Sequence, residues 1–101
     1  MPTFSGINHL AMVTGDMDQT VRFYRDILGM PLVATIGNRP GDYPYRHYFF
    51  RIGEANTIAF FEWPGMVEKR HKPAGLPARG WVQFDHVSFN VEDEESLLEL
   101  Q

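Results

Sequence analysis

A chain of 101 residues, 44% of them hydrophobic and 14% aromatic, has room for one small folded domain and is too apolar for a disordered protein. The formal net charge of −4, with no basic run, argues against a nucleic-acid partner or an anionic membrane surface. Because the chain contains no cysteine, disulfides, thiolate zinc sites and thiol nucleophiles are excluded.

The first residues, Met1 to Gly6, have neither the charged region nor the apolar region of a secretion signal. No later apolar run is long enough to cross a bilayer. We therefore expect a soluble cytoplasmic protein.

Residues 7–13 are predicted to form a β-strand, in which successive side chains point to opposite faces. Leu10 and Met12 share one face. His9 lies on the other face together with Ala11. The apolar pair is therefore expected to be buried, and the histidine to face away from it.

A helix is predicted after a short turn. Asp16 has the position of an N-cap, with Gln19 three residues later at the spacing of a capping box. Gly29 provides a left-handed position at the other end, and Pro31 prevents continuation. Between these ends, apolar residues recur every three or four positions and form one stripe: Met17, Val21, Tyr24, Ile27 and Leu28.

Three more strands are predicted, over residues 31–36, 45–52 and 57–63, and the short segment 53–56 joins the last two as a hairpin. Residues 64–80 contain three prolines and three glycines and no apolar period. This segment is expected to be a linker or a long surface loop.

The end of the chain repeats its beginning. With His86 aligned on His9, a strand over residues 84–91 and a helix beginning at Asp93 follow the same pattern as the first strand and helix. The aligned pairs are Asn8 with Asp85, Leu10 with Val87, Met12 with Phe89, Asp16 with Asp93 and Val21 with Leu98. The second copy reaches only into its helix, so the sequence predicts an incomplete second repeat.

The segments 7–13 and 23–30 resemble the opening strand and helix of the vicinal oxygen chelate superfamily, which comprises glyoxalases, bleomycin resistance proteins and extradiol dioxygenases. Residues 84–91 resemble the opening strand of its second module. The resemblance is specific for the fold and poorly specific for the reaction, because isomerases, epimerases, ring-cleaving dioxygenases, thiol transferases and drug-binding proteins share this scaffold.

The resemblance implies an α+β fold in which two βαβββ modules are related by a pseudo-two-fold axis and enclose a cleft. It implies a first module over residues 1–63, a linker over 64–80, and the βα start of a truncated second module over 81–101. Sheet edges left open by the missing strands favour exchange of elements within a homodimer.

In this family the first strands of the two modules approach each other, which implies that His9 and His86 bind a divalent metal. Their small neighbours, Ala11 and Ser88, leave room beside each imidazole. Ligand type favours Fe(II) or Mn(II), with Zn or Ni as alternatives. The alternative interpretation is that each histidine is an ordinary strand residue.

The remaining ligands would decide the chemistry. Glyoxalase-I-like members place a carboxylate on the fourth strand, and the alignment puts Ala59 there. Glu62 is a candidate ligand three residues later, although strand alternation predicts that it faces away from Ala59 unless a bulge reverses it. A set made of His9, His86 and one carboxylate from a missing strand would match the extradiol dioxygenases; some transferases of the family also use three ligands.

Three further residues are candidates for contact with a substrate. Phe61 and Trp63 would form an apolar wall for an aromatic substrate if they lie on the face of Ala59, and the alternative is ordinary core packing. His47 is a candidate general acid or base, with an ordinary strand histidine as the alternative.

The leading hypothesis is a metal-dependent enzyme that chelates vicinal oxygens of a small substrate, with extradiol cleavage of a catechol first and a glyoxalase-I-like lyase second. A metal-free binding protein of the bleomycin-resistance type is the second hypothesis. A non-catalytic truncated module is the third.

Overall fold

The computed structural model describes residues 1–38, 40–41, 44–68, 71–77, 84 and 86–101. The chain divides into two compact units, residues 1–69 and 70–101, and this division falls within the predicted linker. No helix in the described ranges is long and apolar enough to cross a membrane.

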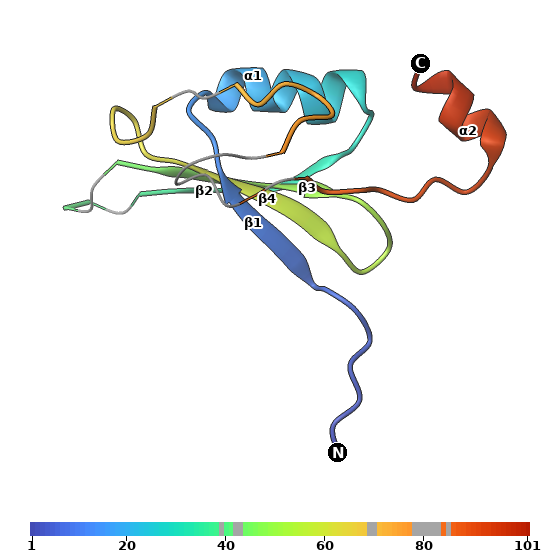
Figure 1. Ribbon diagram of the computed structural model, residues 1–101. Helices are drawn as coiled ribbons and strands as arrows, with labels where there is room; N and C mark the ends of the chain where they lie inside the picture. The colour runs from blue at the N-terminus through green and yellow to red at the C-terminus, as the bar shows by residue number, and fades with distance from the viewer. Residues whose placement is uncertain (39, 42–43, 69–70, 78–83, 85) are drawn as a thin grey trace. The chain divides into compact units, whose positions relative to one another are not determined.

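The first unit has the βαβββ order that the sequence predicts, so the α+β class is confirmed (Figure 1). Each predicted strand is present, with ends shifted by one or two residues. The elements are β1 (His9–Val13), α1 (Met17–Val21) with its π-helical continuation η1 (Arg22–Ile27), β2 (Leu32–Gly37), β3 (Arg46–Arg51) and β4 (Thr57–Glu62).

These strands form one sheet in the order β1-β4-β3-β2. β1 runs parallel to β4, whereas β3 runs antiparallel to both β4 and β2. The helix lies over one face of the sheet (Figure 1). The parallel β1–β4 pair places the first strand of the module beside the last one, so residues of β1 and β4 can share a site.

The helix has the predicted caps, except that the N–H of Asp16 donates to Oγ1 of Thr14 at 3.1 Å, where a capping box would use the side chain of Gln19. The Asp16 side chain accepts a hydrogen bond from the N–H of Gln19 at 3.0 Å, and Gly29 adopts φ +75°, which favours glycine. The second half of the helix differs from the prediction because it widens into a π-turn, where the N–H of Leu28 donates to the Phe23 carbonyl at 2.9 Å.

The core lies between the helix and the sheet. Met17, Phe50 and Ile58 are fully buried, and Phe60 is nearly so. The ring of Tyr24 packs against Phe50 and Phe60 at centroid distances of 5.7 and 4.9 Å. Each fully buried apolar side chain of this size contributes about 1.5–3 kcal/mol to folding, so this layer holds the helix on the sheet.

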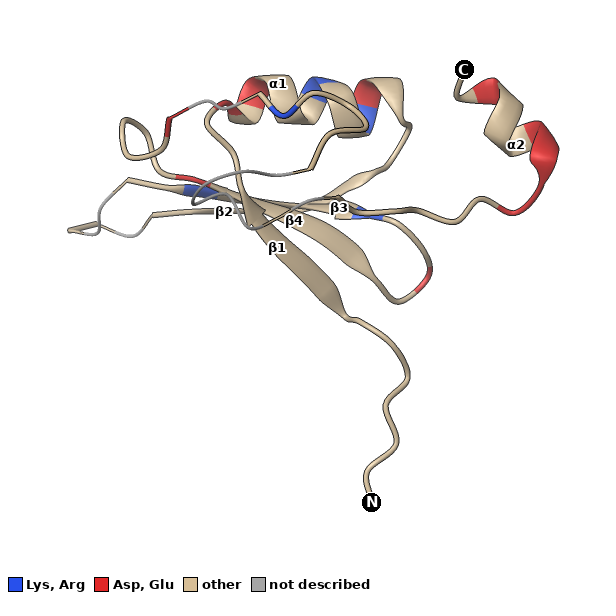
Figure 2. Ribbon diagram, viewed as in Figure 1, with Lys and Arg blue, Asp and Glu red and all other residues tan. Residues whose placement is uncertain are grey.

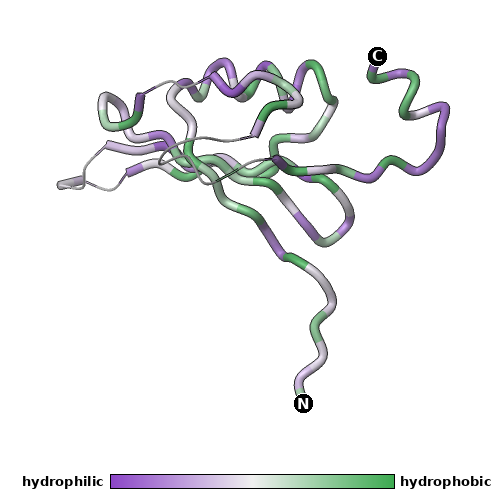
Figure 3. The backbone as a smooth tube through the Cα atoms, in the orientation of Figure 1, coloured by the Kyte–Doolittle hydropathy of each residue, from purple (hydrophilic) through white to green (hydrophobic). Residues whose placement is uncertain are grey.

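The second unit contains α2 (Glu94–Glu99), whose N-cap Asp93 accepts a hydrogen bond from the N–H of Ser96 at 2.8 Å, as the repeat predicts. Acidic residues gather at its N-terminal end (Figure 2), where the helix dipole favours negative charge. Hydrophilic residues begin this helix and hydrophobic residues follow within it (Figure 3).

The strand predicted over residues 84–91 is wrong for the described positions, because residue 84 and residues 86–91 have no strand pairing. A strand requires a neighbour to bond its backbone groups, and the described part of this unit contains no other strand. Residues 86–90 nevertheless alternate between exposed and half-buried, as residues 9–13 do. The second repeat therefore keeps the side-chain alternation of the first, without the backbone hydrogen bonds of a paired strand.

Candidate functional site

The register of the strands assigns side chains to two faces of the sheet. Ala11 and Phe49 both lie opposite Ala59, and His47 lies opposite Phe61. Since alternate residues share a face, these side chains lie on one side and the helix-facing core lies on the other. We call this side the histidine face; it consists of His9, Ala11, His47, Phe49, Ala59, Phe61 and Trp63.

His9 is an exposed residue at the start of β1. Its Nδ1 lies 2.8 Å from Oδ1 of Asn8, and its ring meets the ring of Phe49 edge-on, with centroids 5.8 Å apart. The alternating exposure of β1 confirms the prediction that His9 points to the other face of the strand from Leu10 and Met12. Its ring is held through Nδ1, and Nε2 remains as a candidate metal ligand.

His47 is only 9% exposed. Its ring stacks on Phe61, with centroids 3.5 Å apart and planes 13° apart, and it also contacts Phe49 at 4.3 Å. Burial, and to a lesser extent the charge of His9, lowers the pKa of His47, so its ring is neutral near pH 7. Among the described residues, its Nε2 is the buried side-chain nitrogen that no partner satisfies.

Phe61 and Trp63 stack with centroids 4.8 Å apart and planes 8° apart. Together with His47 they form a row of nearly parallel rings, which we call the aromatic row. The sequence left open whether these two residues lie on the face of Ala59, and they do. A role for them in substrate binding stays a prediction.

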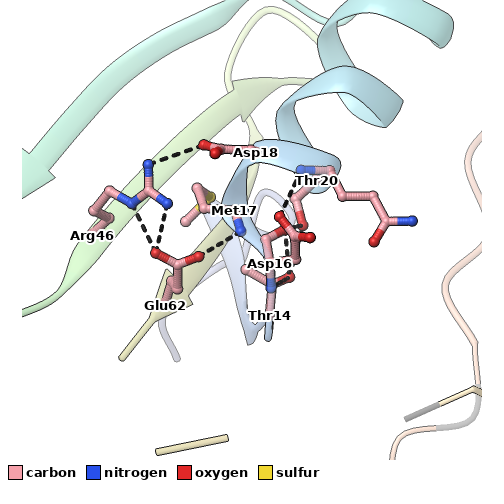
Figure 4. Close-up of polar contacts among 8 residues, drawn as sticks. Thr14, Asp16, Met17, Asp18, Thr20, Arg46 and Glu62 are labelled. Atoms are coloured by element: carbon pink, nitrogen blue, oxygen red, sulfur yellow. Dashed lines mark hydrogen bonds and ion pairs between the residues drawn. The ribbon is translucent and has the colours of Figure 1, made fainter. Parts of the chain in front are cut away.

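Glu62 lies on the opposite face, toward the helix, as strand alternation predicts. It is 8% exposed. One carboxylate oxygen accepts the N–H of Met17 at 2.6 Å, and the other accepts Nε of Arg46 at 2.8 Å (Figure 4). Arg46 also contacts Asp18 at 3.2 Å. The pairing of β3 with β4 is regular through Glu62, so no bulge turns it round. Its position argues for a structural role and against the ligand role considered above.

Ala59, at the position where glyoxalase-I-like members place a carboxylate, is fully buried and has no ligand atom in its side chain. On this face, His9 is the exposed imidazole of the first unit and therefore its candidate metal ligand. The described ranges contain no cluster of three or more His, Cys, Asp or Glu that could hold an ion. An exposed imidazole whose Nδ1 is already bonded fits a single nitrogen ligand. His86 is also exposed, in the second unit, and its pairing with His9 stays a prediction.

Two contacts of this face were not predicted. The first is the contact of His47 with Phe61. The hairpin segment 53–56 pairs Arg51 with Thr57 and so places His47 opposite Phe61, a register that could have been counted from the sequence. The bond between Asn8 and His9 has a weaker signal: in both repeats, the residue before the histidine carries a side-chain oxygen.

Two lactoylglutathione lyases are among the known proteins similar to this chain. A probable lactoylglutathione lyase of Vibrio parahaemolyticus is 28% identical over 87 residues, which cover 86% of this chain and 57% of that protein. The lactoylglutathione lyase of Haemophilus influenzae is 28% identical over 89 residues, covering 86% and 58%. The chain thus spans little more than half the length of these relatives.

Two solved structures share the fold. The crystal structure of SMU.1112c has a TM-score of 0.58 at 20% identity and covers 97% of this chain and 74% of its own. The trypanothione-dependent glyoxalase I of Leishmania major has a TM-score of 0.55 at 23% identity, with 70% and 52% covered. The sequence profile of the Glyoxalase/Bleomycin resistance protein/Dioxygenase superfamily matches residues 6–101. The chain belongs to this superfamily.

Proposed function

We propose that this chain supplies His9 to a divalent-metal site, and that the whole protein uses this site as a glyoxalase-I-like lyase acting on a small substrate with adjacent oxygens. One observation carries the proposal: His9 stands exposed on the face that also carries Ala11, Ala59 and the aromatic row, with its Nδ1 hydrogen-bonded to Asn8. His86, the equivalent residue of the repeat, is proposed as the second ligand.

The order of the two candidate reactions follows the relatives. Extradiol cleavage came first on ligand count, but that order is not supported, because the matched curated relatives are named as lactoylglutathione lyases. Ala59 still departs from the glyoxalase-I pattern. We therefore propose lyase chemistry with a reduced ligand set of His9, His86 and one carboxylate from outside this chain.

Besides His9, three residues of the histidine face have a role in this proposal. When bound, a divalent ion supplies Lewis-acid polarisation of two adjacent substrate oxygens. His47, a neutral imidazole with an unpaired Nε2, is proposed to exchange a proton or a hydrogen bond with the substrate, which requires this buried nitrogen to become accessible. Phe61 and Trp63, whose rings stack on each other, would exclude water from one side of the substrate. Iron, manganese, zinc and nickel are the candidate metals.

The test compares activities on the metal-loaded protein. Samples reconstituted anaerobically with Fe(II), Mn(II), Zn(II) or Ni(II) are assayed with the hemithioacetal of methylglyoxal and glutathione, and for oxygen uptake with a catechol panel. We expect lyase activity that a chelator removes, and its loss in His9→Ala but not in His71→Ala, an exposed histidine outside the face. Oxygen uptake without lyase activity would reverse the order of the two reactions. The absence of both activities would reject the proposal.

A second candidate is a metal-free binding protein. The aromatic row favours it, because stacked rings bind a flat ligand without any metal. A dialysed sample that contains no metal but melts at a higher temperature with an aromatic ligand would support this candidate. A sample that retains one metal ion per protein chain after dialysis would reject this candidate.

A further inference from the structure

We propose that Asn8 is a positioning residue, which fixes the tautomer and the direction of the His9 ring so that Nε2 is the metal-binding nitrogen. This inference rests on the proposed metal site. The contact that carries it joins Oδ1 of Asn8 to Nδ1 of His9 at 2.8 Å.

The chemistry of the two groups determines which nitrogen is free. An amide oxygen only accepts hydrogen bonds, so Nδ1 of His9 must carry the proton. In a neutral imidazole the other nitrogen then has the lone pair, and a metal binds this lone pair. Asn8 therefore selects one of two tautomers, and it selects the one that presents Nε2.

The Asn8 backbone is itself anchored to the sheet. Its carbonyl accepts the N–H of Thr57, the first residue of β4, at 3.0 Å. The ring of Phe49 also contacts the His9 ring edge-on. The imidazole is thus restrained by an amide on one side and a phenyl ring on another, although the residue itself is exposed. Restraint of this kind lowers the entropy lost when a metal binds.

The sequence repeat gives an independent reason. Asp85 precedes His86 as Asn8 precedes His9, so each histidine of the repeat follows a residue with a side-chain oxygen acceptor. Asp85 lies outside the described residues, and this second pair rests on the sequence alone. A partner that orients a metal-binding histidine typically changes metal affinity 10- to 100-fold when it is removed.

The first measurement is made on the chain without metal. Nitrogen-15 NMR of the neutral His9 imidazole is expected to show the Nδ1–H tautomer in the wild type. Asn8→Ala should lose this preference and Asn8→Asp, which keeps the acceptor, should retain it. A dominant Nε2–H tautomer in the wild type would overturn the inference, because the amide would then be donating.

The second measurement is a titration with Ni(II) alone. Asn8→Ala is expected to bind about 10-fold or more weakly than the wild type, Asn8→Asp should restore binding, and the matched surface variant Asn38→Ala should not differ from the wild type. Equal binding by Asn8→Ala and the wild type would overturn the positioning role and leave the metal site standing. If the wild type binds no Ni(II), the proposed metal site fails, and the positioning role fails with it.

Discussion

His47 combines good packing with an unsatisfied polar atom. Its ring is sandwiched flat against Phe61, a geometry that a phenyl ring could also adopt, yet its Nε2 is buried without a partner. An unpaired buried polar group costs about 1–3 kcal/mol. The fold alone therefore does not require a histidine here, and this separates a role in packing from a role in chemistry.

His47→Phe should accordingly make the chain more stable. The variant removes the unpaired nitrogen and keeps the aromatic row, so the melting temperature is expected to rise by about 4 °C, while lyase turnover falls. Thermal unfolding followed by circular dichroism measures the shift, and His71→Phe serves as the exposed control. A lower melting temperature would mean that Nε2 is satisfied in solution and that its role is structural.

The pKa of His47 also predicts how stability depends on pH. Burial lowers this pKa below its ordinary value of 6.5, so the unfolded chain binds a proton more readily than the folded chain. The contribution is fully present above pH 6.5 and is lost as the pH falls from there through the lowered pKa. Urea unfolding at several pH values should show this loss in the wild type, and a smaller loss in His47→Phe. Identical pH profiles would contradict the lowered pKa.

Among the elements, the start of α1 is joined to the sheet by one buried carboxylate. Glu62, at the end of β4, joins the first N–H of the helix to Arg46 of β3. Asp18 belongs to the same cluster but is mostly exposed, with 75% of its side chain accessible. Because solvent screens exposed pairs, the Asp18 contact is expected to contribute little, and the cluster depends on Glu62.

Substitutions in this cluster should rank by burial. Glu62→Ala leaves Arg46 and the Met17 N–H without their acceptor and should cost about 3 kcal/mol. Glu62→Gln should cost about 1–2 kcal/mol, and Asp18→Asn less than about 0.5 kcal/mol. Urea unfolding measures all three. Metal affinity should be unchanged in Glu62→Gln, and a fall in metal affinity without a loss of stability would restore the ligand role that its position argues against.

The elements of the first unit could be predicted from the sequence because their signals are local. The Asp16 cap, the left-handed Gly29 and the alternation in β1 depend on residues close to one another, and all three are confirmed. The π-turn in η1 was missed, because the apolar stripe there fits a regular helix equally well. The strand over residues 84–91 was wrong in its described part because strand formation also requires a partner, which a local pattern does not supply.

The candidate site was predictable only in part. Strand alternation placed His9 and Glu62 on opposite faces, and the structure agrees. The stack of His47 on Phe61 requires the pairing of two strands, and the bond from Asn8 to His9 requires a particular side-chain rotamer. The pairing could have been counted from the hairpin, whereas the rotamer is not contained in the identity of the residues.

At the scale of the whole molecule, the sheet leaves an edge for assembly. β1 is the terminal strand of the order β1-β4-β3-β2, so its outer edge can accept another strand. We predict a homodimer, for which sedimentation equilibrium should give twice the chain mass of 11.6 kDa. A single species at the mass of one chain, at micromolar concentration, would contradict this prediction.

We propose from the sequence repeat that His9 and His86 bind one ion together. The most direct test of this proposal is calorimetric titration of Ni(II) into the wild type and the variants His9→Ala, His86→Ala and the double variant. We predict one ion per pair of histidines, and a loss of affinity in each single variant as large as in the double variant, because removing either ligand breaks the shared site. Wild-type affinity in His9→Ala, or losses that simply add in the double variant, would show that the two imidazoles do not share an ion.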